Sequence, residues 1–275
     1  MKKILFPTDF SETANNAFLY ALNLAENQNA ELYVLHAFQY PMVNGGIDAV
    51  VLENVYDTIE LGNFENLKDH IPFLRKIAED NGFENVNIKF FIKEGMISFV
   101  LPTFIEEEKV DFVVMGTTGN SGIDKFLFGS NTMNAIKNLK IPVLSVPNGY
   151  KYKGIKNIGF TTVFEEKDRR ALDYLVDVAF RYKAKLHCLN ISKDETYDVS
   201  TLNHWKDYYK DDPIDFSIYS AEDYIDGVLE FIKEEKIDLL TVVSRNKTFF
   251  EKIFSPSFTK KVLSKNIVPL FVIHE

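Results

Sequence analysis

The chain has 275 residues, of which 46% are hydrophobic and 26% are charged, and its formal net charge is −9. These proportions exclude a disordered or collagen-like chain, and the length predicts about two domains. The acidic balance argues against a general nucleic-acid-binding or anionic-membrane surface, because phosphate groups would be repelled.

Short runs of β-branched and aromatic residues alternate with helical patterns along the first half of the chain. The predicted strands cover residues 2–6, 31–38, 86–92, 110–115 and 141–146. Helices are predicted from an apolar stripe over 14–24, near 67–81, at 97–108 and at 131–138. Apolar strands separated by helices are typical of a parallel sheet covered on both faces, which binds ligands at the carboxyl ends of its strands.

The stretch from Gln39 to Asn85 joins the second and third predicted strands and is unusually apolar for a loop. Its apolar residues include Tyr40, Met42, Val43, Ile47, Val50, Val51 and Leu52. Two roles are open for this stretch. It could cover a bound ligand, or it could pack against the other half of the chain.

The second half of the chain repeats the first. Lys2–Phe10 is similar to Lys156–Phe164, at an offset of 156 − 2 = 154 residues. Near the ends of the halves the offset is 268 − 141 = 127, because Ile141–Val146 is similar to Val268–Ile273. The difference, 154 − 127 = 27, predicts a net deletion between the second and third strands of the second copy. We therefore predict two tandem, doubly wound parallel-sheet domains, at residues 1–148 and 152–275.

A glycine-rich segment from Met115 to Thr132 begins where a predicted strand ends and finishes at the start of a helix. Gly116 and Gly119 permit close approach of a ligand to the backbone. The run from Gly129 to Thr132 would present helix N-terminal N–H groups and two hydroxyls, which suit an anion. The segment lacks the spacing of a Walker-type phosphate loop, and a surface turn shaped by glycines is the alternative.

The spacing Gly116-x2-Gly119-x9-Gly129-Ser130 resembles the motif of the nucleotide-binding universal stress proteins. The runs Ile4–Ser11, Val34–Ala37 and Ile141–Val146 are also similar to that family. The resemblance covers the first half nearly end to end and the second half weakly, as in members with two domains in one chain. It implies an adenine nucleotide alpha hydrolase-like, Rossmann-like fold, in which the last strands of the two halves pair to form a pseudo-dimer. Association of two chains into a homodimer is left open.

The same resemblance implies a site for ATP or another adenine nucleotide in the first half. Asp9 would bond the nucleoside beside a wall formed by Pro7 and Thr8, and the backbone of Ala37 would contact the adenine edge. The ribose and phosphates would be held by Met115, Gly116, Thr118, Gly119, Gly129, Ser130, Asn131 and Thr132. Asp9 has an alternative role as the cap of the first helix. Mg²⁺ could accompany the phosphates, although no carboxylate pair marks a dedicated metal site.

The second half has lost most of this motif. At the 127 offset, Gly116, Gly119 and Gly129 correspond to Val243, Asn246 and Pro256, and at the 154 offset Asp9 corresponds to Val163. Valine adds a side chain where the phosphates need bare backbone, and proline removes an N–H donor. We predict that the second half does not bind nucleotide in this mode.

The sequence therefore predicts a regulatory, adenine-nucleotide-binding stress-response protein with one site, in its first half. One alternative is a slow ATP-hydrolysing enzyme, for which Asp124 is the only evident, and weak, candidate base. The other alternative is a nucleotide-free interaction scaffold, which the degenerate second half would suit.

Other reactive side chains are better explained as structural. The five histidines show no metal-ligand spacing, and we expect His36 and His187 to be core or strand-end residues. Cys188, the single cysteine, is expected to be a buried small hydrophobe, and Trp205 to lie in the core under a helix. No apolar run reaches the roughly 20 residues that span a bilayer, and no signal peptide is evident. The expected setting is cytoplasmic.

Overall fold

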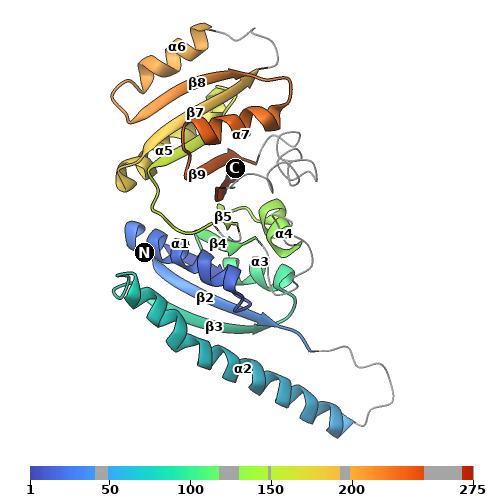
Figure 1. Cartoon of the computed structure of the whole chain (residues 1–275). Helices are drawn as coiled ribbons and strands as arrows, with labels where there is room; N and C mark the ends of the chain where they lie inside the picture. Colours follow the sequence, from blue (N-terminus) through green and yellow to red (C-terminus); the bar gives the residue numbers. More distant parts are fainter. Residues whose placement is uncertain (41–48, 118–129, 148–149, 193–198, 245–267, 275) are drawn as a thin grey trace. The chain divides into compact units, whose positions relative to one another are not determined.

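The computed structural model of the chain describes residues 1–40, 49–117, 130–147, 150–192, 199–244 and 268–274 (Figure 1). The described residues form two compact units, the first extending to Leu139 and the second beginning at Lys140. Both units are α/β, as the sequence predicts. Among the helices of the described ranges, none is long and apolar enough to cross a membrane.

The first unit contains a parallel sheet with the strand order β3-β2-β1-β4. Its strands are β1 Lys3–Pro7, β2 Glu31–Phe38, β3 Ile88–Glu94 and β4 Phe112–Gly116. Its helices are α1 Glu12–Gln28, α2 Ala49–Asp80, α3 Ile97–Glu108 and α4 Ser130–Asn138. Helix α1 contacts α2, and α3 contacts α4. The strand order reverses between β1 and β4, so right-handed crossovers place these two pairs on opposite faces of the sheet.

The core of this unit is formed by apolar strands and by one face of α1. Ile4, Leu5 and Phe6 of β1 are all buried, as expected for a strand covered on both sides. Phe18 of α1 packs on Phe6 with ring centroids 5.3 Å apart. Ser11 caps α1, because its side-chain oxygen accepts a hydrogen bond from the N–H of Ala14.

Helix α2 corrects the expectation of a long apolar loop with a helix confined to residues 67–81. It runs over 32 residues, from Ala49 to Asp80. Only its second half packs into the core, through Leu67, Leu74 and Ala78. The leading half contains no proline and a single glycine, and its Val, Leu, Glu and Asn residues are compatible with a helix once the packed half has nucleated it.

The second unit contains a sheet with the strand order β5-β10-β9-β6-β7-β8. Its strands are β5 Val143–Val146, β6 Asn157–Thr161, β7 Lys185–Ser192, β8 Ile214–Ser220, β9 Leu239–Val243 and β10 Leu270–Ile273. They are accompanied by the 3-10 turn η1 Glu166–Asp168 and by the helices α5 Arg169–Tyr182, α6 Val199–Tyr208 and α7 Tyr224–Glu234. The order β8-β7-β6-β9 repeats the order β3-β2-β1-β4, and β5 pairs with β10 in the antiparallel sense. Since β5 pairs with β10, it belongs to the second compact unit, although the predicted domain limit lies after it.

The backbone of the two units carries matching conformations at matching positions. Within the described ranges, six residues other than glycine have a positive φ, and they form three pairs: Phe10 and Phe164, Asn29 and Lys183, Lys109 and Lys236. The pairs are separated by 154, 154 and 127 residues, which are the two offsets of the sequence repeat. Positive φ is uncommon outside glycine, so this coincidence supports a duplication.

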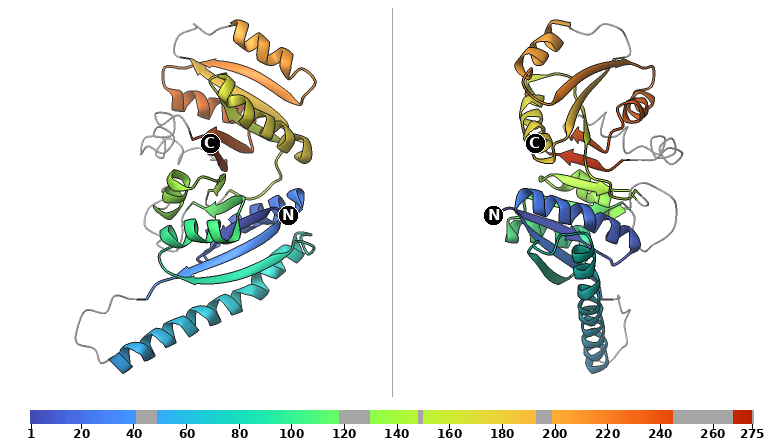
Figure 2. Two further views of the ribbon diagram at one scale, coloured as in Figure 1. Left: turned by 180° about the vertical axis from the view of Figure 1, so that it is seen from behind. Right: turned by 60° about the vertical axis from the view of Figure 1, so that its left-hand side comes forward.

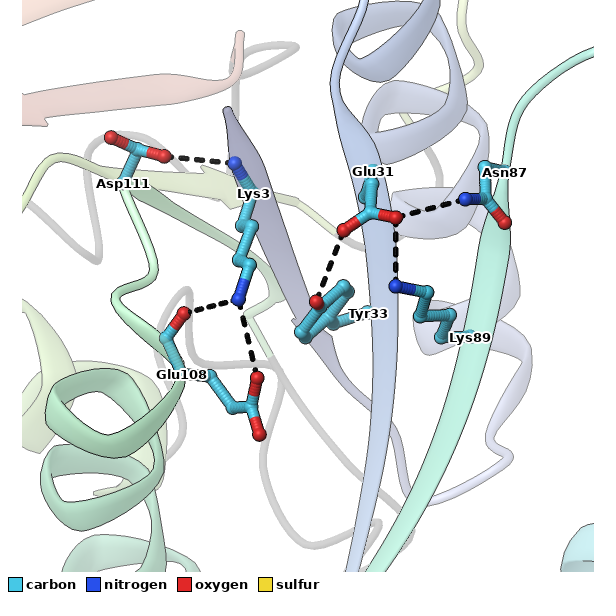
Figure 3. Close-up of polar contacts among 7 residues, drawn as sticks. All are labelled: Lys3, Glu31, Tyr33, Asn87, Lys89, Glu108 and Asp111. Atoms are coloured by element: carbon cyan, nitrogen blue, oxygen red, sulfur yellow. Dashed lines mark hydrogen bonds and ion pairs between the residues drawn. The ribbon is translucent and has the colours of Figure 1, made fainter. Parts of the chain in front are cut away.

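Figure 3 shows a network of polar contacts at the amino ends of the first unit's strands. Lys3 Nζ lies 3.3 Å from the carboxylate of Glu108, and the Lys3 backbone N–H donates to Asp111. Glu31 accepts hydrogen bonds from Tyr33, Asn87 and Lys89, and the bond from Lys89 lowers the pKa of the Glu31 carboxyl. In the second unit, Asp238 likewise accepts from the N–H of Asn157. These contacts join neighbouring strands at the edge where parallel sheets do not bind ligands, so we regard them as structural.

A buried histidine in the second unit makes its stability depend on pH. His187 Nδ1 lies 3.1 Å from the Glu235 carboxylate, and Nε2 lies 3.2 Å from Asn157 Oδ1. Burial lowers the pKa of His187 below its ordinary value of 6.5, and the Glu235 charge only partly opposes this effect. Because the unfolded chain then takes up a proton more readily than the folded unit, stability should be greatest above pH 6.5 and should fall as the pH drops below it.

We expect the melting temperature of the second unit to fall from pH 7 to 5.5, and to fall less steeply in His187→Gln. Thermal melts followed by the fluorescence of Trp205, the single tryptophan, would report on this unit. Equal slopes in the two proteins would contradict the assignment to His187.

Candidate functional site

A cavity of about 210 Å³ lies in the first unit, at the carboxyl ends of β1 and β4. It is lined by Pro7, Thr8, Asp9, Ala14, Ala37, Gln39, Ile97, Met115, Gly116, Asn131 and Thr132. These residues come from the ends of β1, β2 and β4 and from the starts of α1, α3 and α4. The cavity therefore lies where the strand order reverses, the position at which doubly wound sheets bind ligands.

Eight of the twelve residues predicted from the sequence line this cavity: Pro7, Thr8, Asp9, Ala37, Met115, Gly116, Asn131 and Thr132. Three others, Thr118, Gly119 and Gly129, lie outside the described residues, as does Asp124. Ser130 begins α4, and only its backbone is described. The lining residues that were not predicted are Ala14, Gln39 and Ile97. Ile97 begins α3 and Gln39 follows β2, so the rule that loops after parallel strands line the crevice could have found both.

The turn between β1 and α1 is held by its own side chains. Thr8 N–H donates to the carbonyl of Leu35, and Thr8 Oγ1 accepts from the N–H of Phe10. Asp9 Oδ1 accepts from the N–H of Ser11 at 3.1 Å. Because Ser11 caps α1, Asp9 is not the cap and instead supports the turn that precedes it.

Aromatic contacts with β2 and α2 support the turn between β1 and α1. The ring of Phe10 stacks on that of His70 in α2, with centroids 4.2 Å apart, and also contacts His36. His36 Nδ1 lies 3.0 Å from the Thr8 carbonyl oxygen, and since a carbonyl only accepts, Nδ1 carries the hydrogen. His36 is buried at a strand end, as predicted.

The backbone of Ala37 faces the cavity side of β2. Leu35 accepts from Thr8 after β1, whereas Phe38 accepts from Gly95 after β3. In a parallel strand the N–H and C=O groups of one residue point to the same side, and the side alternates along the strand. Ala37 therefore presents its N–H and C=O towards β1. Because the pairing of β1 with β2 ends at Pro7 and Leu35, these groups are available to a ligand.

The start of α4 is tied to the end of β4. The buried hydroxyl of Thr132 donates to the Gly116 carbonyl at 2.8 Å. A hydroxyl that donates its only hydrogen in this way offers nothing to a phosphate oxygen, so Thr132 would contribute through its backbone N–H. The first turn of α4, from Ser130 to Thr132, has N–H groups without partners within the helix, and the helix dipole favours an anion there.

Gly116 lies close to the first turn of α1. A Cβ atom at Gly116 would lie 3.1 Å from Thr13 Cγ2 and 3.2 Å from the Thr13 carbonyl oxygen. The absence of a side chain thus permits α1 to approach β4 and leaves the cavity open at this point. Only Asp9 carries an ionisable side chain among the described lining residues. In the described parts of the chain, no group of three or more His, Cys, Asp or Glu residues could hold a metal ion.

At the position of the second unit that corresponds to Ala14 stands a buried carboxylate, Asp168. Asp168 Oδ2 accepts from the Thr162 hydroxyl at 2.7 Å and from the Val163 N–H at 3.2 Å. Asp168 is 6% exposed, and its charge adds to the burial that raises the pKa of the Cys188 thiol. At the offset of 168 − 14 = 154, Asp168 corresponds to Ala14, whose methyl group lines the first unit's cavity. The sequence comparison identified the lost glycines and missed this residue.

Comparison with known proteins identifies the family. The model of the universal stress protein family matches residues 1–147, which is more than half of the 275 residues. The chain belongs to the universal stress protein family. A universal stress protein of Methanocaldococcus jannaschii is 34% identical over 146 residues, which cover 53% of this chain and 81% of the relative. A second universal stress protein of the same organism is 31% identical over 156 residues, covering 53% of this chain and 94% of that relative.

Solved structures extend the similarity of this universal stress protein to the whole chain. A universal stress protein from Archaeoglobus fulgidus superimposes with a TM-score of 0.74 at 19% identity, covering 99% of this chain and 96% of that one. A protein of unknown function from Pseudomonas aeruginosa covers 100% of this chain and 92% of its own, with a TM-score of 0.64 at 12% identity. At such identities the likeness concerns the fold alone, and it confirms the predicted class of tandem, Rossmann-like α/β domains.

Proposed function

We propose that this universal stress protein binds an adenine nucleotide in the cavity of its first unit, and that it is regulatory rather than catalytic. The observation that carries the proposal is the convergence of eight motif residues on one cavity at the carboxyl ends of β1 and β4. These residues are up to 125 positions apart, from Pro7 to Thr132, so their convergence is a property of the fold.

Each part of the cavity suits one part of the ligand. The N–H and C=O groups of Ala37, which point towards β1, would hydrogen-bond the adenine edge. The Asp9 carboxylate would accept a hydrogen bond from a ribose hydroxyl. The N–H groups at the start of α4, together with the glycine segment, would bind the phosphates without a basic patch. A Mg²⁺ ion would take its oxygen ligands mainly from the phosphates and water, since Asp9 is the one carboxylate among the described lining residues.

The lining residues favour binding over hydrolysis. Nucleotide hydrolysis needs a group that positions or deprotonates the attacking water. Among the described residues around the cavity, only Asp9 could serve as a base, and one of its oxygens already accepts from Ser11. We therefore propose that the protein binds one nucleotide, in its first unit, and that the occupancy of this site follows the nucleotide concentration.

Isothermal titration calorimetry with ATP, ADP and AMP tests this proposal, together with mass spectrometry of nucleotide released when the purified protein is denatured. We expect one nucleotide per chain. Replacing Ala14 by aspartate would place a second carboxylate beside Thr8 and Asp9, as Asp168 stands beside Thr162 and Val163. Repulsion of the phosphates should then weaken binding on the order of 100-fold.

Ala14→Asn is the matched control, because it adds nearly the same volume without the charge and should lose less affinity. A wild-type chain that retains no nucleotide and binds none of the three would contradict the proposal. Two nucleotides per chain would contradict the assignment to the first unit alone.

A further inference from the structure

The leading half of α2, residues 49–64, exceeds what the fold of the unit requires. A helix of 32 residues is about 48 Å long, whereas the seven-residue strand β3 beside it spans only about 23 Å. Figure 2 shows α2 extending well past the end of the sheet in both views. In the second unit, the equivalent connection, from β7 to β8, contains helix α6, which has only 10 residues. The additional helix therefore calls for a role of its own.

Large apolar side chains are exposed on this part of α2. Val50 is 65% exposed, Leu61 58% and Phe64 53%. They lie on one stripe with alternating spacings of four and three residues, which consists of Val50, Asn54, Asp57, Leu61, Phe64, Lys68, Ile71 and Arg75. We call this stripe the α2 seam. It occupies a different face of the helix from Leu67, Leu74 and Ala78, which pack into the unit's own core. A four-three spacing is the pattern by which two helices pack along their length. Four of the eight positions of the α2 seam are apolar, and two of these, Leu61 and Phe64, are adjacent at its centre.

Two of the three charged residues of the α2 seam, Asp57 and Lys68, favour a second copy of the helix packed antiparallel. Two copies of α2 packed antiparallel about a point between Gly62 and Asn63 bring together positions whose numbers sum to 125. Leu61 then lies against Phe64 of the second copy, and Asp57 lies against Lys68 of the second copy. Parallel packing would instead place like charges together. In the described part of the chain, neither Asp57 nor Lys68 forms an ion pair, so both remain available.

We propose that the α2 seam is an interface between two copies of this chain, with their α2 helices antiparallel. Four apolar side chains, Leu61 and Phe64 from each copy, form its centre, and the Asp57–Lys68 pairs flank it on both sides. In this register the two helices overlap over residues 49–76, about 42 Å, so a face about 10 Å wide buries roughly 400 Å² per copy, or about 800 Å² in total, which is the size of weak, transient interfaces. The dimer should therefore be reversible, with a dissociation constant on the order of micromolar.

Sedimentation velocity of the full chain at about 1 to 100 µM tests this interface. The wild-type chain should pass from monomer to dimer in this range. Leu61→Glu should remain monomeric throughout, because it places a charge at the apolar centre. Phe73→Glu is the matched control: Phe73 is 47% exposed but lies off the α2 seam, so this variant should dimerise as the wild type does. Far-ultraviolet circular dichroism should show equal helix content in both variants.

Charge reversal tests the antiparallel arrangement. Asp57→Lys and Lys68→Asp should each weaken the dimer about tenfold, since each creates two like-charge pairs. The double variant should recover most of the affinity, because both pairs are restored with their signs exchanged. A wild-type chain that stays monomeric at about 100 µM would overturn the proposal, as would equal weakening by Phe73→Glu and Leu61→Glu. A double variant no tighter than the single variants would overturn the antiparallel register.

Discussion

Replacing Gly116 by valine is expected to abolish nucleotide binding and to destabilise the first unit by about 2 kcal/mol. The new Cβ would lie 3.1–3.2 Å from Thr13 side-chain and carbonyl atoms, closer than ordinary contacts. Part of this contact is with backbone, so α1 would have to shift as a whole to relieve it. Such a shift moves the turn that carries Asp9, and the added methyl groups also occupy the cavity.

Calorimetry with ATP and denaturation followed by circular dichroism would measure the two effects. Gly62→Val is the matched control, because a Cβ at Gly62 in α2 meets no atom within 4 Å. That variant should bind nucleotide as the wild type does and should be at least as stable. Wild-type affinity in Gly116→Val would show that the cavity beside Gly116 is not where the nucleotide binds.

Replacing Asp168 by alanine should destabilise the second unit by about 2 kcal/mol, or lower its melting temperature by roughly 8 °C. The buried Thr162 hydroxyl and the Val163 N–H would both lose their acceptor. The loss is large because a buried donor without a partner keeps the full cost of its desolvation.

Trp205 is buried in the same unit, and its ring lies 6.0 Å from that of Phe164, so its fluorescence should follow this unfolding. Asp168→Asn is the matched control, since both hydrogen bonds go to the single oxygen Oδ2, which an amide oxygen can replace. We expect about half the loss, because hydrogen bonds to a charged acceptor are roughly twice as strong as those to a neutral one. If Asp168→Ala melts as the wild type does, the carboxylate does not hold this turn together.

Much of the fold follows from local patterns in the sequence. The apolar runs predicted the strands of the first unit to within two residues, and α3 was predicted over the residues it occupies, 97–108. The predictions of β1, β2 and β4 succeed because these strands are buried along most of their length, so that burial determines residue type. Helix α3 buries one face, which gives its sequence a helical period. The leading half of α2 was not predicted, because none of its side chains from residue 50 to 64 is fully buried and it contacts its own unit only at points such as Tyr56 on Tyr40. Its exposed valines resemble those of a strand or a loop.

The part of the candidate site that lies at the ends of strands was predictable from the sequence. Pro7, Thr8, Ala37 and Gly116 follow or end strands that lie side by side in a doubly wound sheet, so the strand order alone brings them together. Ala14 gave no such signal, because an alanine in the first turn of a helix is equally compatible with a core position. Its importance emerged only from its counterpart, Asp168.

The sequence by itself determined that this universal stress protein contains two copies of one domain, and that only the first retains the glycine motif. Two offsets and a glycine spacing are properties of residue order, so they need no coordinates. Only the tertiary structure decided how the last strands pair. It also decided that the Thr132 hydroxyl donates to the Gly116 carbonyl, and that Asp168 accepts hydrogen bonds from the turn after the first strand of the second copy. Each of these depends on hydrogen bonds between residues on separate elements, whose backbone groups meet only after the chain has folded.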